Sequence, residues 1–183
     1  MIKERNMMTL KGKKILVLIG PGFEELEFFV PIMRMREAYA EVVVAGDKAG
    51  KSYFGKHGNC MEGKADIGFD EVNPEEFDAV IVPGGWAPDK IRRIASVKKI
   101  VKEMYDMGKI VGMICHAGLV GISAGIVKGH DAIGSEGIKD DLLNAGATWR
   151  NEPAFRSGNI VWGRVVPDIP DFCREMIKSL QDA

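Results

Sequence analysis

The stretch Ile-Val-Gly-Met-Ile-Cys-His-Ala-Gly-Leu-Val-Gly-Ile-Ser-Ala-Gly, residues 110–125, joins an apolar run to a pair of reactive side chains. Residues 110–114 are apolar and include β-branched side chains, which predicts a short buried strand. Cys115 and His116 follow directly, and the small residues after them allow a helix to pack closely on a sheet. A strand, a sharp turn that carries a nucleophile and then a helix make up a nucleophile elbow. We therefore expect Cys115 at the end of a central strand.

The thiol of Cys115 has two interpretations at this point. Amide groups at the start of the following helix favour an anion, which predicts a lowered thiol pKa and a larger thiolate fraction. A cysteine in an apolar setting is also commonly a small, inert core residue. Residues 110–125 alone leave both interpretations open.

Composition predicts the class of protein. The chain has 183 residues, 46% hydrophobic and 28% charged, which is typical of one globular domain. Its net charge of −1 gives no reason to expect nucleic acid or a membrane surface as a partner. The 3 cysteines show no CxxC spacing, so we expect a reducing, cytoplasmic environment without disulfides or a metal site. The prediction is a single soluble domain over residues 1–183, with residues 1–11 as a flexible N-terminal extension.

Buried strands and helices alternate along the chain. Besides residues 110–114, the pattern predicts strands at 13–20, 41–45, 77–82 and 159–165, and helices at 24–39, 95–107, 117–125, 138–145 and 169–180. Residues 46–72 suggest a small hairpin or meander. Pro31 should kink or divide the first helix, whose residues Leu26, Phe29, Val30 and Met33 share one face. This order predicts an α/β sandwich with a mostly parallel sheet.

The first strand ends in Gly20-Pro21-Gly22, followed by Glu24 and Glu25. The glycine spacing is that of a dinucleotide-binding loop, but Glu25 stands at its third position, which argues against a bound pyrophosphate. Functional groups collect beyond the carboxyl ends of parallel strands. Glu24 is therefore our candidate for a buried carboxyl group that shares a proton with the thiol. The alternative is an ordinary acid in the first turn of a helix.

The third strand ends in Pro83-Gly84-Gly85-Trp86. Glycines leave backbone amides accessible, and amides here and at His116 would form an oxyanion hole. The alternative is a simple Gly-Gly turn. His116 adjoins the nucleophile, and a base beside its nucleophile in sequence is unusual, so this pairing alone is a weak signal.

Three segments together resemble a known family: residues 114–118 at the elbow, the loop 82–89, and residues 23–27. They are similar to the DJ-1/PfpI (ThiJ/PfpI) superfamily, most closely to PfpI-type intracellular cysteine proteases, over residues 12–181. The resemblance implies a flavodoxin-like three-layer sandwich. It also implies a homodimer or homohexamer with active sites at the subunit interfaces.

The resemblance assigns roles to individual residues. It implies Cys115 as nucleophile, His116 as its base and Glu24 as the supporting acid, with Gly84 and Gly85 in the oxyanion loop. Asp89 matches the position of a Glu that orients the histidine of an adjacent subunit, but it is one methylene shorter. Trp86 stands where relatives often carry a small or basic residue, and we expect it to crowd the mouth of the pocket.

Three functions are compatible with these residues. The first is a cysteine-dependent hydrolase of the peptidase type. The second is a glutathione-independent glyoxalase or deglycase acting on methylglyoxal or glycated amines, which the crowding by Trp86 favours slightly. The third is a redox sensor or chaperone without catalysis. We expect no cofactor and no metal, and either a small aldehyde or a peptide as substrate.

Overall fold

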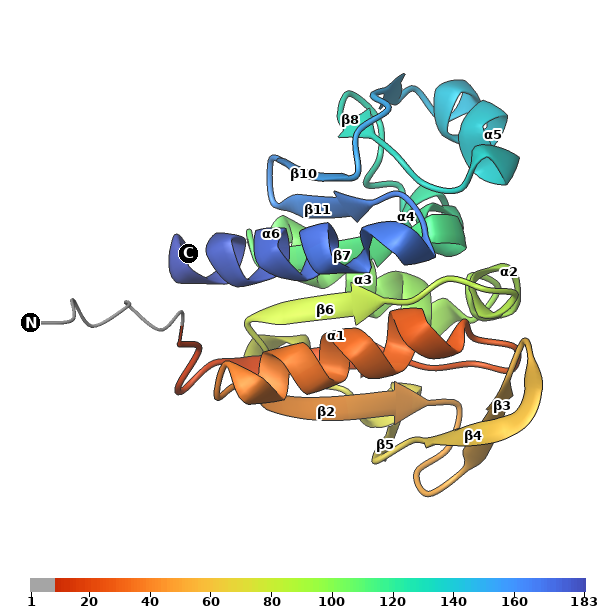
Figure 1. The fold of residues 1–183 in the computed structure, drawn as a ribbon, viewed down its shortest axis with the longest axis vertical. Helices are drawn as coiled ribbons and strands as arrows, with labels where there is room; N and C mark the ends of the chain where they lie inside the picture. Colours follow the sequence, from red (N-terminus) through yellow and green to blue (C-terminus); the bar gives the residue numbers. More distant parts are fainter. Residues whose placement is uncertain (1–8) are drawn as a thin grey trace, which may run out of the picture.

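The computed structural model describes residues 9–183, apart from the side chains of residues 59–61, and Figure 1 shows its central sheet between two layers of helices. The sheet has seven strands in the order β10-β11-β7-β6-β1-β2-β5, and only the β10–β11 pair is antiparallel. The strands are β1 (Lys14–Leu18), β2 (Glu41–Gly46), β5 (Ile67–Gly68), β6 (Ala79–Val82), β7 (Ile110–Ile114), β10 (Ala154–Ser157) and β11 (Ile160–Gly163). The predicted α/β architecture with a mostly parallel sheet is confirmed.

The remaining elements surround this sheet. The helices are α1 (Glu25–Glu37), α2 (Ala87–Ile91), α3 (Ala95–Asp106), α4 (Gly118–Ala124), α5 (Lys139–Asn144) and α6 (Ile169–Gln181). Two small sheets are formed by β3 (Ser52–Gly55) with β4 (Gly58–Lys64), and by β8 (Asp131–Ala132) with β9 (Thr148–Trp149). Short 3₁₀ turns lie at Phe69–Glu71, Pro74–Glu76, Cys115–Ala117, Glu136–Ile138 and Val166–Asp168. The hairpin predicted within residues 46–72 is the β3–β4 pair, whereas α2 and β10 were not predicted.

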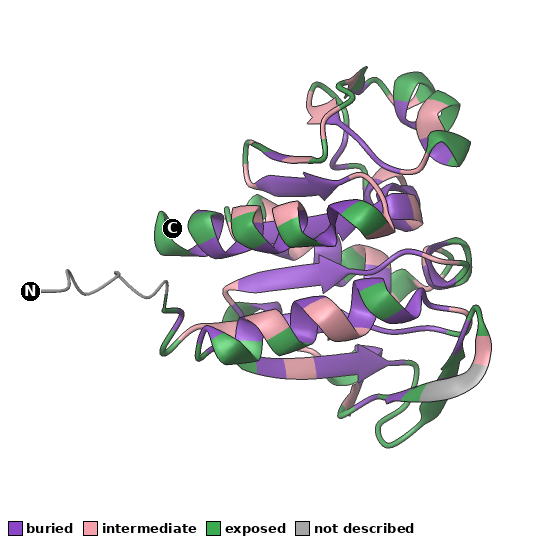
Figure 2. Cartoon of the chain, viewed as in Figure 1, coloured by how far each residue is buried: buried purple, intermediate pink, exposed green. Residues whose placement is uncertain are grey.

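Alternating side chains of the central strands face the two helical layers. In β1, Ile15 and Val17 pack with α1 and α6, while Leu16 and Leu18 pack on the other face with α3 and α4. Figure 2 shows the central strands buried almost throughout. Both faces are covered, which explains why these strands are continuous apolar runs in the sequence.

Helix α1 differs from its prediction in two ways. It runs unbroken through Pro31, so the expected division into two pieces does not occur. Its inward residues are Phe28, Ile32 and Met35, whereas Leu26 is 51% and Met33 59% exposed. Apolar side chains lie all round this helix, so periodicity alone could not decide which face turns to the sheet.

The N-terminal prediction falls mostly on residues 1–8, which lie outside the described residues. Leu10, inside the predicted extension, is 1% exposed and donates its N–H to the Ala38 carbonyl. The packed part of the chain therefore includes Leu10. Among residues 9–183, no helix combines the length and the apolar character needed to cross a membrane.

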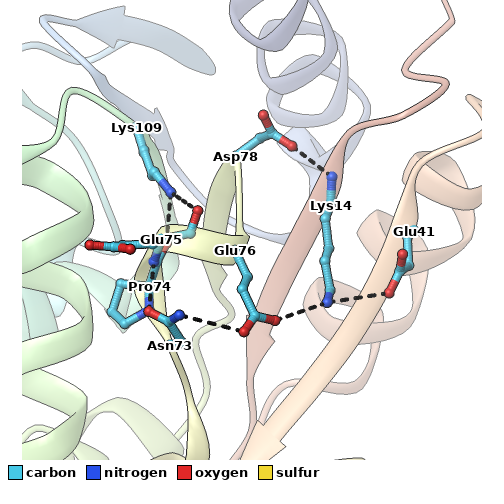
Figure 3. Close-up of polar contacts among 8 residues, drawn as sticks. All are labelled: Lys14, Glu41, Asn73, Pro74, Glu75, Glu76, Asp78 and Lys109. Atoms are coloured by element: carbon cyan, nitrogen blue, oxygen red, sulfur yellow. Dashed lines mark hydrogen bonds and ion pairs between the residues drawn. The ribbon is translucent and has the colours of Figure 1, made fainter.

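A polar network joins the amino ends of the central strands, at the edge of the sheet opposite Cys115 (Figure 3). Lys14 Nζ lies 3.4 Å from Glu76 and 3.6 Å from Glu41, and the Lys14 N–H donates to Asp78 at 2.8 Å. Lys109 Nζ donates to the carbonyls of Pro74 and Glu75 at 2.7 and 2.8 Å. Exposed ion pairs contribute little to stability, so this edge is held mainly by the strands themselves.

Phe172 of α6 provides a test of the core. It is fully buried, and a Cβ on Gly112 or Gly163 would lie only 3.0 or 2.9 Å from its ring, so the ring occupies a notch left by these two glycines. We expect Phe172→Ala to lower the free energy of unfolding by about 3–5 kcal/mol. Lys178→Ala, at an exposed position of the same helix, should change it by less than about 0.5 kcal/mol. Denaturant titration measures both, and equal values for the two variants would contradict this packing.

Candidate active site

Cys115 lies on a strained turn at the end of β7. Its φ is +61°, a conformation that residues other than glycine rarely adopt, and it begins the 3₁₀ turn that leads into α4. Helix α4 packs closely because it begins with small residues: a Cβ on Gly118 or Gly121 would lie 2.9 Å from Ile138 or 2.8 Å from Met113. The strand, turn and helix have the geometry of a nucleophile elbow.

The sulfur of Cys115 is nearly enclosed, with the residue 8% exposed. His116 Nδ1 lies 3.2 Å from Sγ, and the backbone N–H groups of Gly85 and His116 are directed at the sulfur. Two amides converging on the reacting atom are the donors that an oxyanion formed there requires. These groups therefore come from two segments, the Cys115-His116 turn after β7 and the loop after β6 that carries Gly85.

Glu27 is the carboxyl group that contacts the thiol. It is 0% exposed, and its Oε2 accepts the Gly84 N–H at 2.8 Å. Its Oε1 is buried without a hydrogen-bond partner among the described residues, and the Cys115 thiol is close enough to lower the pKa of this carboxyl group. Gly84 is required for this approach, because a Cβ there would lie 2.5 Å from Glu27 Oε2 and 2.7 Å from Cys115 Cβ.

The structure places Glu27, and not Glu24, against the thiol. Glu24 precedes α1, and its Oε2 folds back to accept the Glu27 N–H at 2.7 Å, which is the role of a helix N-cap. The supporting acid that we expected at Glu24 is therefore Glu27. The three-residue spacing of the two acids, typical of a helix start, was the signal that could have separated them.

Burial determines the protonation of this pair. It raises the pKa of Glu27 to about 7, with a further increase from the charge of Glu24. Burial and the adjacent Glu27 carboxylate raise the pKa of the Cys115 thiol to about 12, against the lowering effect of the amides of Gly85 and His116. The thiol pKa is therefore raised, and not lowered as the following helix led us to expect, chiefly because the sulfur is buried. Protonated Glu27 would remove this repulsion, so the pair is arranged to hold a single negative charge.

His116 is half-buried, and burial lowers its pKa, with a further decrease from the nearby charge of Lys56. A lowered pKa keeps the imidazole neutral at pH 7 and able to accept a proton. The other two histidines do not line the cavity beside Cys115. His130 bonds to Tyr105 and Ser157, and His57 contacts Glu25.

A cavity of about 510 Å³ opens beside the elbow. Its lining residues are Lys56, Gly85, Trp86, Asp89, Lys90, His116 and Leu119. Trp86 is one of these lining residues and is 66% exposed. Asp89 pairs with Arg93 at 2.5 Å and shares the cavity wall with His116 of its own chain.

One group of described residues has the donor set of a metal site. Glu24, Glu25 and His57 present ligand atoms within 4.8 Å of one another. The Glu25 carboxylate already accepts the His57 N–H at 2.9 Å and contacts His57 Nδ1 at 2.7 Å. These bonds attach the β3–β4 turn to the start of α1, which accounts for the cluster without an ion.

Comparison with known proteins places this site in a family. The sequence profile of the DJ-1/PfpI family matches residues 13–179. A deglycase of Pyrococcus abyssi and the deglycase PfpI of Pyrococcus furiosus are each 40% identical, over 92% of this chain and 99% of theirs. A Bacillus subtilis protein whose name proposes a cysteine protease is 36% identical, over 93% of this chain and 99% of its own.

Solved structures of DJ-1/PfpI-like proteins have the same fold as this chain. A two-domain protein of Anabaena variabilis, with DJ-1/ThiJ/PfpI-like and ferritin-like domains, superposes with a TM-score of 0.90 at 36% identity. The match covers 92% of this chain but 48% of that protein. DJ-1β of Drosophila melanogaster has a TM-score of 0.84 at 22% identity, over 93% of this chain and 94% of its own, and so shares the fold. The family profile, the relatives and the elbow geometry together show that this chain belongs to the DJ-1/PfpI family.

Proposed function

We propose that this protein is a cysteine-dependent hydrolase of the cytoplasm that removes α-dicarbonyl adducts from amines, a deglycase. One observation carries the choice of substrate class: His116 and Gly85, next to the nucleophile, line a cavity of about 510 Å³ whose wall includes the exposed Trp86. This space suits a small molecule, whereas a peptide requires an extended groove. The deglycases of Pyrococcus, aligned over nearly the whole chain, support the same activity.

The chemistry follows from the side chains at the elbow. His116 takes the thiol proton, and the sulfur of Cys115 attacks the carbinol carbon of the adduct. The C–S bond forms as the C–N bond breaks, and the amine leaves with the proton that His116 held. The carbinol oxygen of the resulting hemithioacetal lies at the amides of Gly85 and His116.

The hemithioacetal then rearranges without loss of atoms. A proton moves from its carbinol carbon to the neighbouring ketone carbon, with His116 as carrier. The carbinol O–H proton passes to the ketone oxygen, so the first carbon becomes the carbonyl of a thioester and the second bears the hydroxyl group of the hydroxy acid. Water adds to the thioester, which releases the hydroxy acid and restores the thiol. Free methylglyoxal enters the same sequence by addition of the thiol to its aldehyde carbon, and it leaves as lactate.

Peptide hydrolysis is a second candidate, because it needs the same nucleophile and oxyanion site. The name of the B. subtilis relative favours it. A peptide bond would have to enter past Trp86 to reach the sulfur. The two activities are separable by substrate, while both depend on Cys115.

The decisive experiment follows release of amine and lactate from methylglyoxal-treated N-acetyllysine in phosphate buffer. We expect Cys115→Ser to lower the rate at least about a thousandfold, and His116→Gln about a hundredfold. Cys173→Ser is the matched control, because this cysteine is buried in α6 and does not line the cavity. Lactate formation by Cys115→Ser at the wild-type rate would refute the proposal, and cleavage of a fluorogenic peptide alone would favour the second candidate.

The raised pKa of Glu27 predicts a pH dependence of stability. A carboxyl group with a folded-state pKa of about 7, above its ordinary value, favours folding most below pH 4.5 and loses this contribution as the pH rises through 7. Between pH 4.5 and 8, wild type should lose about 3 kcal/mol of unfolding free energy relative to Glu27→Gln. Glu136→Gln, at an exposed carboxylate, should follow wild type. Parallel curves for wild type and Glu27→Gln would contradict the assignment.

We also propose a homodimer or homohexamer with active sites at its subunit interfaces. An apolar stripe on α1 supports it, because Leu26 and Met33 are exposed and Phe29 and Val30 between them are only half-buried. Exposed Asp89 in the cavity wall is available to the His116 of a second copy.

The double variant Leu26→Lys/Met33→Lys should sediment as a monomer, because two charges cannot be buried in an apolar contact. Met107→Lys, which charges an exposed apolar residue outside the stripe, should sediment as wild type. If Asp89 acts on a second subunit, the monomer and Asp89→Ala should lose deglycase activity together. A fully active monomer would exclude that role for Asp89.

A further inference from the structure

The cavity beside Cys115 contains two lysines that the reaction does not use. Lys56 comes from the turn between β3 and β4, and Lys90 comes from α2, so the two side chains approach the cavity from different elements. Neither lysine forms an ion pair with any carboxylate of the described residues. The charge of Lys56 also acts on the buried Glu27 carboxyl group, but two ammonium groups without a direct ion pair would still attract an anion to the cavity.

Hydrogen bonds fix the backbone that carries Lys56. The Lys56 N–H donates to the Phe23 carbonyl at 2.8 Å, and the next N–H, that of His57, donates to Glu25 Oε1 at 2.9 Å. The turn that carries Lys56 is therefore fixed on both sides. Lys90 Nζ lies 3.7 Å from the point that a Cβ on Gly22 would occupy, so its ammonium group lies over the loop before α1.

The charges around the cavity leave a positive excess. Asp89 is the one carboxylate among the lining residues, and Arg93 neutralises it at 2.5 Å. Glu25, behind the turn, is paired with His57. Apart from His116, the remaining lining side chains are those of Trp86 and Leu119, which are largely apolar and would contact the uncharged part of a ligand.

We propose that this cavity is a subsite for a carboxylate group of the substrate, bound by Lys56 and Lys90 while Cys115 attacks at the other end of the molecule. The inference rests on the proposed function for the identity of the reacting carbon. It narrows the substrate class to adducts of amines that carry a free carboxylate, such as glycated amino acids, over adducts of neutral amines. Lys56 and Lys90 are specificity residues for this class.

Alkylation of Cys115 by two reagents of nearly the same shape tests the subsite without any substrate. Iodoacetate carries a carboxylate and iodoacetamide a neutral amide, and with both reagents the thiolate sulfur bonds to the CH₂ carbon as iodide leaves. The quantity measured is the ratio of the iodoacetate rate to the iodoacetamide rate at Cys115, followed by peptide mass spectrometry. The same ratio for N-acetylcysteine corrects for intrinsic reactivity.

At low salt, we expect the ratio of the iodoacetate rate to the iodoacetamide rate at Cys115 to be about five times the same ratio for N-acetylcysteine. Lys56→Met and Lys90→Met should each lower it by about threefold, because each removes one exposed charge contact. Added salt should reduce the wild-type ratio by screening. The matched control is Lys102→Met, which removes the same charge from α3, where Lys102 pairs with Asp106 at 2.5 Å.

A wild-type ratio equal to that of N-acetylcysteine would overturn the proposal, as would an equal decrease in Lys102→Met. If Cys115 reacts with neither reagent, pyruvate and acetamide are titrated against tryptophan fluorescence, with Trp86→Phe identifying the signal of Trp86. Saturation by pyruvate that requires Lys56 supports the subsite, and its absence refutes it.

These measurements separate the inference from the deglycase proposal. The protein could show a raised iodoacetate-to-iodoacetamide ratio that depends on both lysines and yet release no amine from glycated N-acetyllysine or its amide. That result would support the carboxylate subsite and refute the deglycase activity. Amine release at equal rates from glycated N-acetyllysine and from its amide would support the deglycase activity and refute the carboxylate subsite.

Discussion

The contact between the buried Glu27 carboxyl group and the thiol of Cys115 is the constraint on which the site depends. It places two titratable groups side by side where both are largely shielded from water, so they cannot both carry a charge at low cost. Gly84 makes this contact possible. Its N–H donates to one oxygen of the Glu27 carboxyl group, and the absence of a Cβ leaves room for the side chains of Glu27 and Cys115. The strained backbone of Cys115 is tolerated because the surrounding strands and α4 hold it there.

Three strand ends meet at this contact because the sheet is parallel. Strands β1, β6 and β7 are neighbours, so the segments that follow them supply Glu27, the Gly84-Gly85 amides and Cys115 at one edge. The β3–β4 hairpin adds Lys56 from outside the sheet, and its attachment to Phe23 and Glu25 fixes that position. The Cys115-His116 turn, the Gly85 amide and Lys56 thus belong to separate segments of the chain, which the fold brings to the same cavity.

Much of this arrangement could be predicted from particular residues. The apolar run of residues 110–114 identified β7, and the small residues after Cys115 indicated a closely packed helix, as α4 shows. The inward face of α1 could not be predicted, because apolar side chains surround that helix and Leu26 and Met33 are the exposed ones. Helix α2 was missed because five residues that begin beside a Gly-Gly turn show no periodicity.

The sequence by itself determined the class of fold and the position of the Cys115-His116 pair at the end of a central strand, because alternating apolar runs and the turn that follows residues 110–114 are local patterns that need no long-range contact. Only the tertiary structure decided which acid meets the thiol and which lysines face the cavity. Glu24 and Glu27 differ by less than one helical turn, and the helix start directs the first to the backbone and the second into the sheet edge. Lys56 and Lys90 come together because a hairpin and a helix far apart in the chain close over the same strand ends.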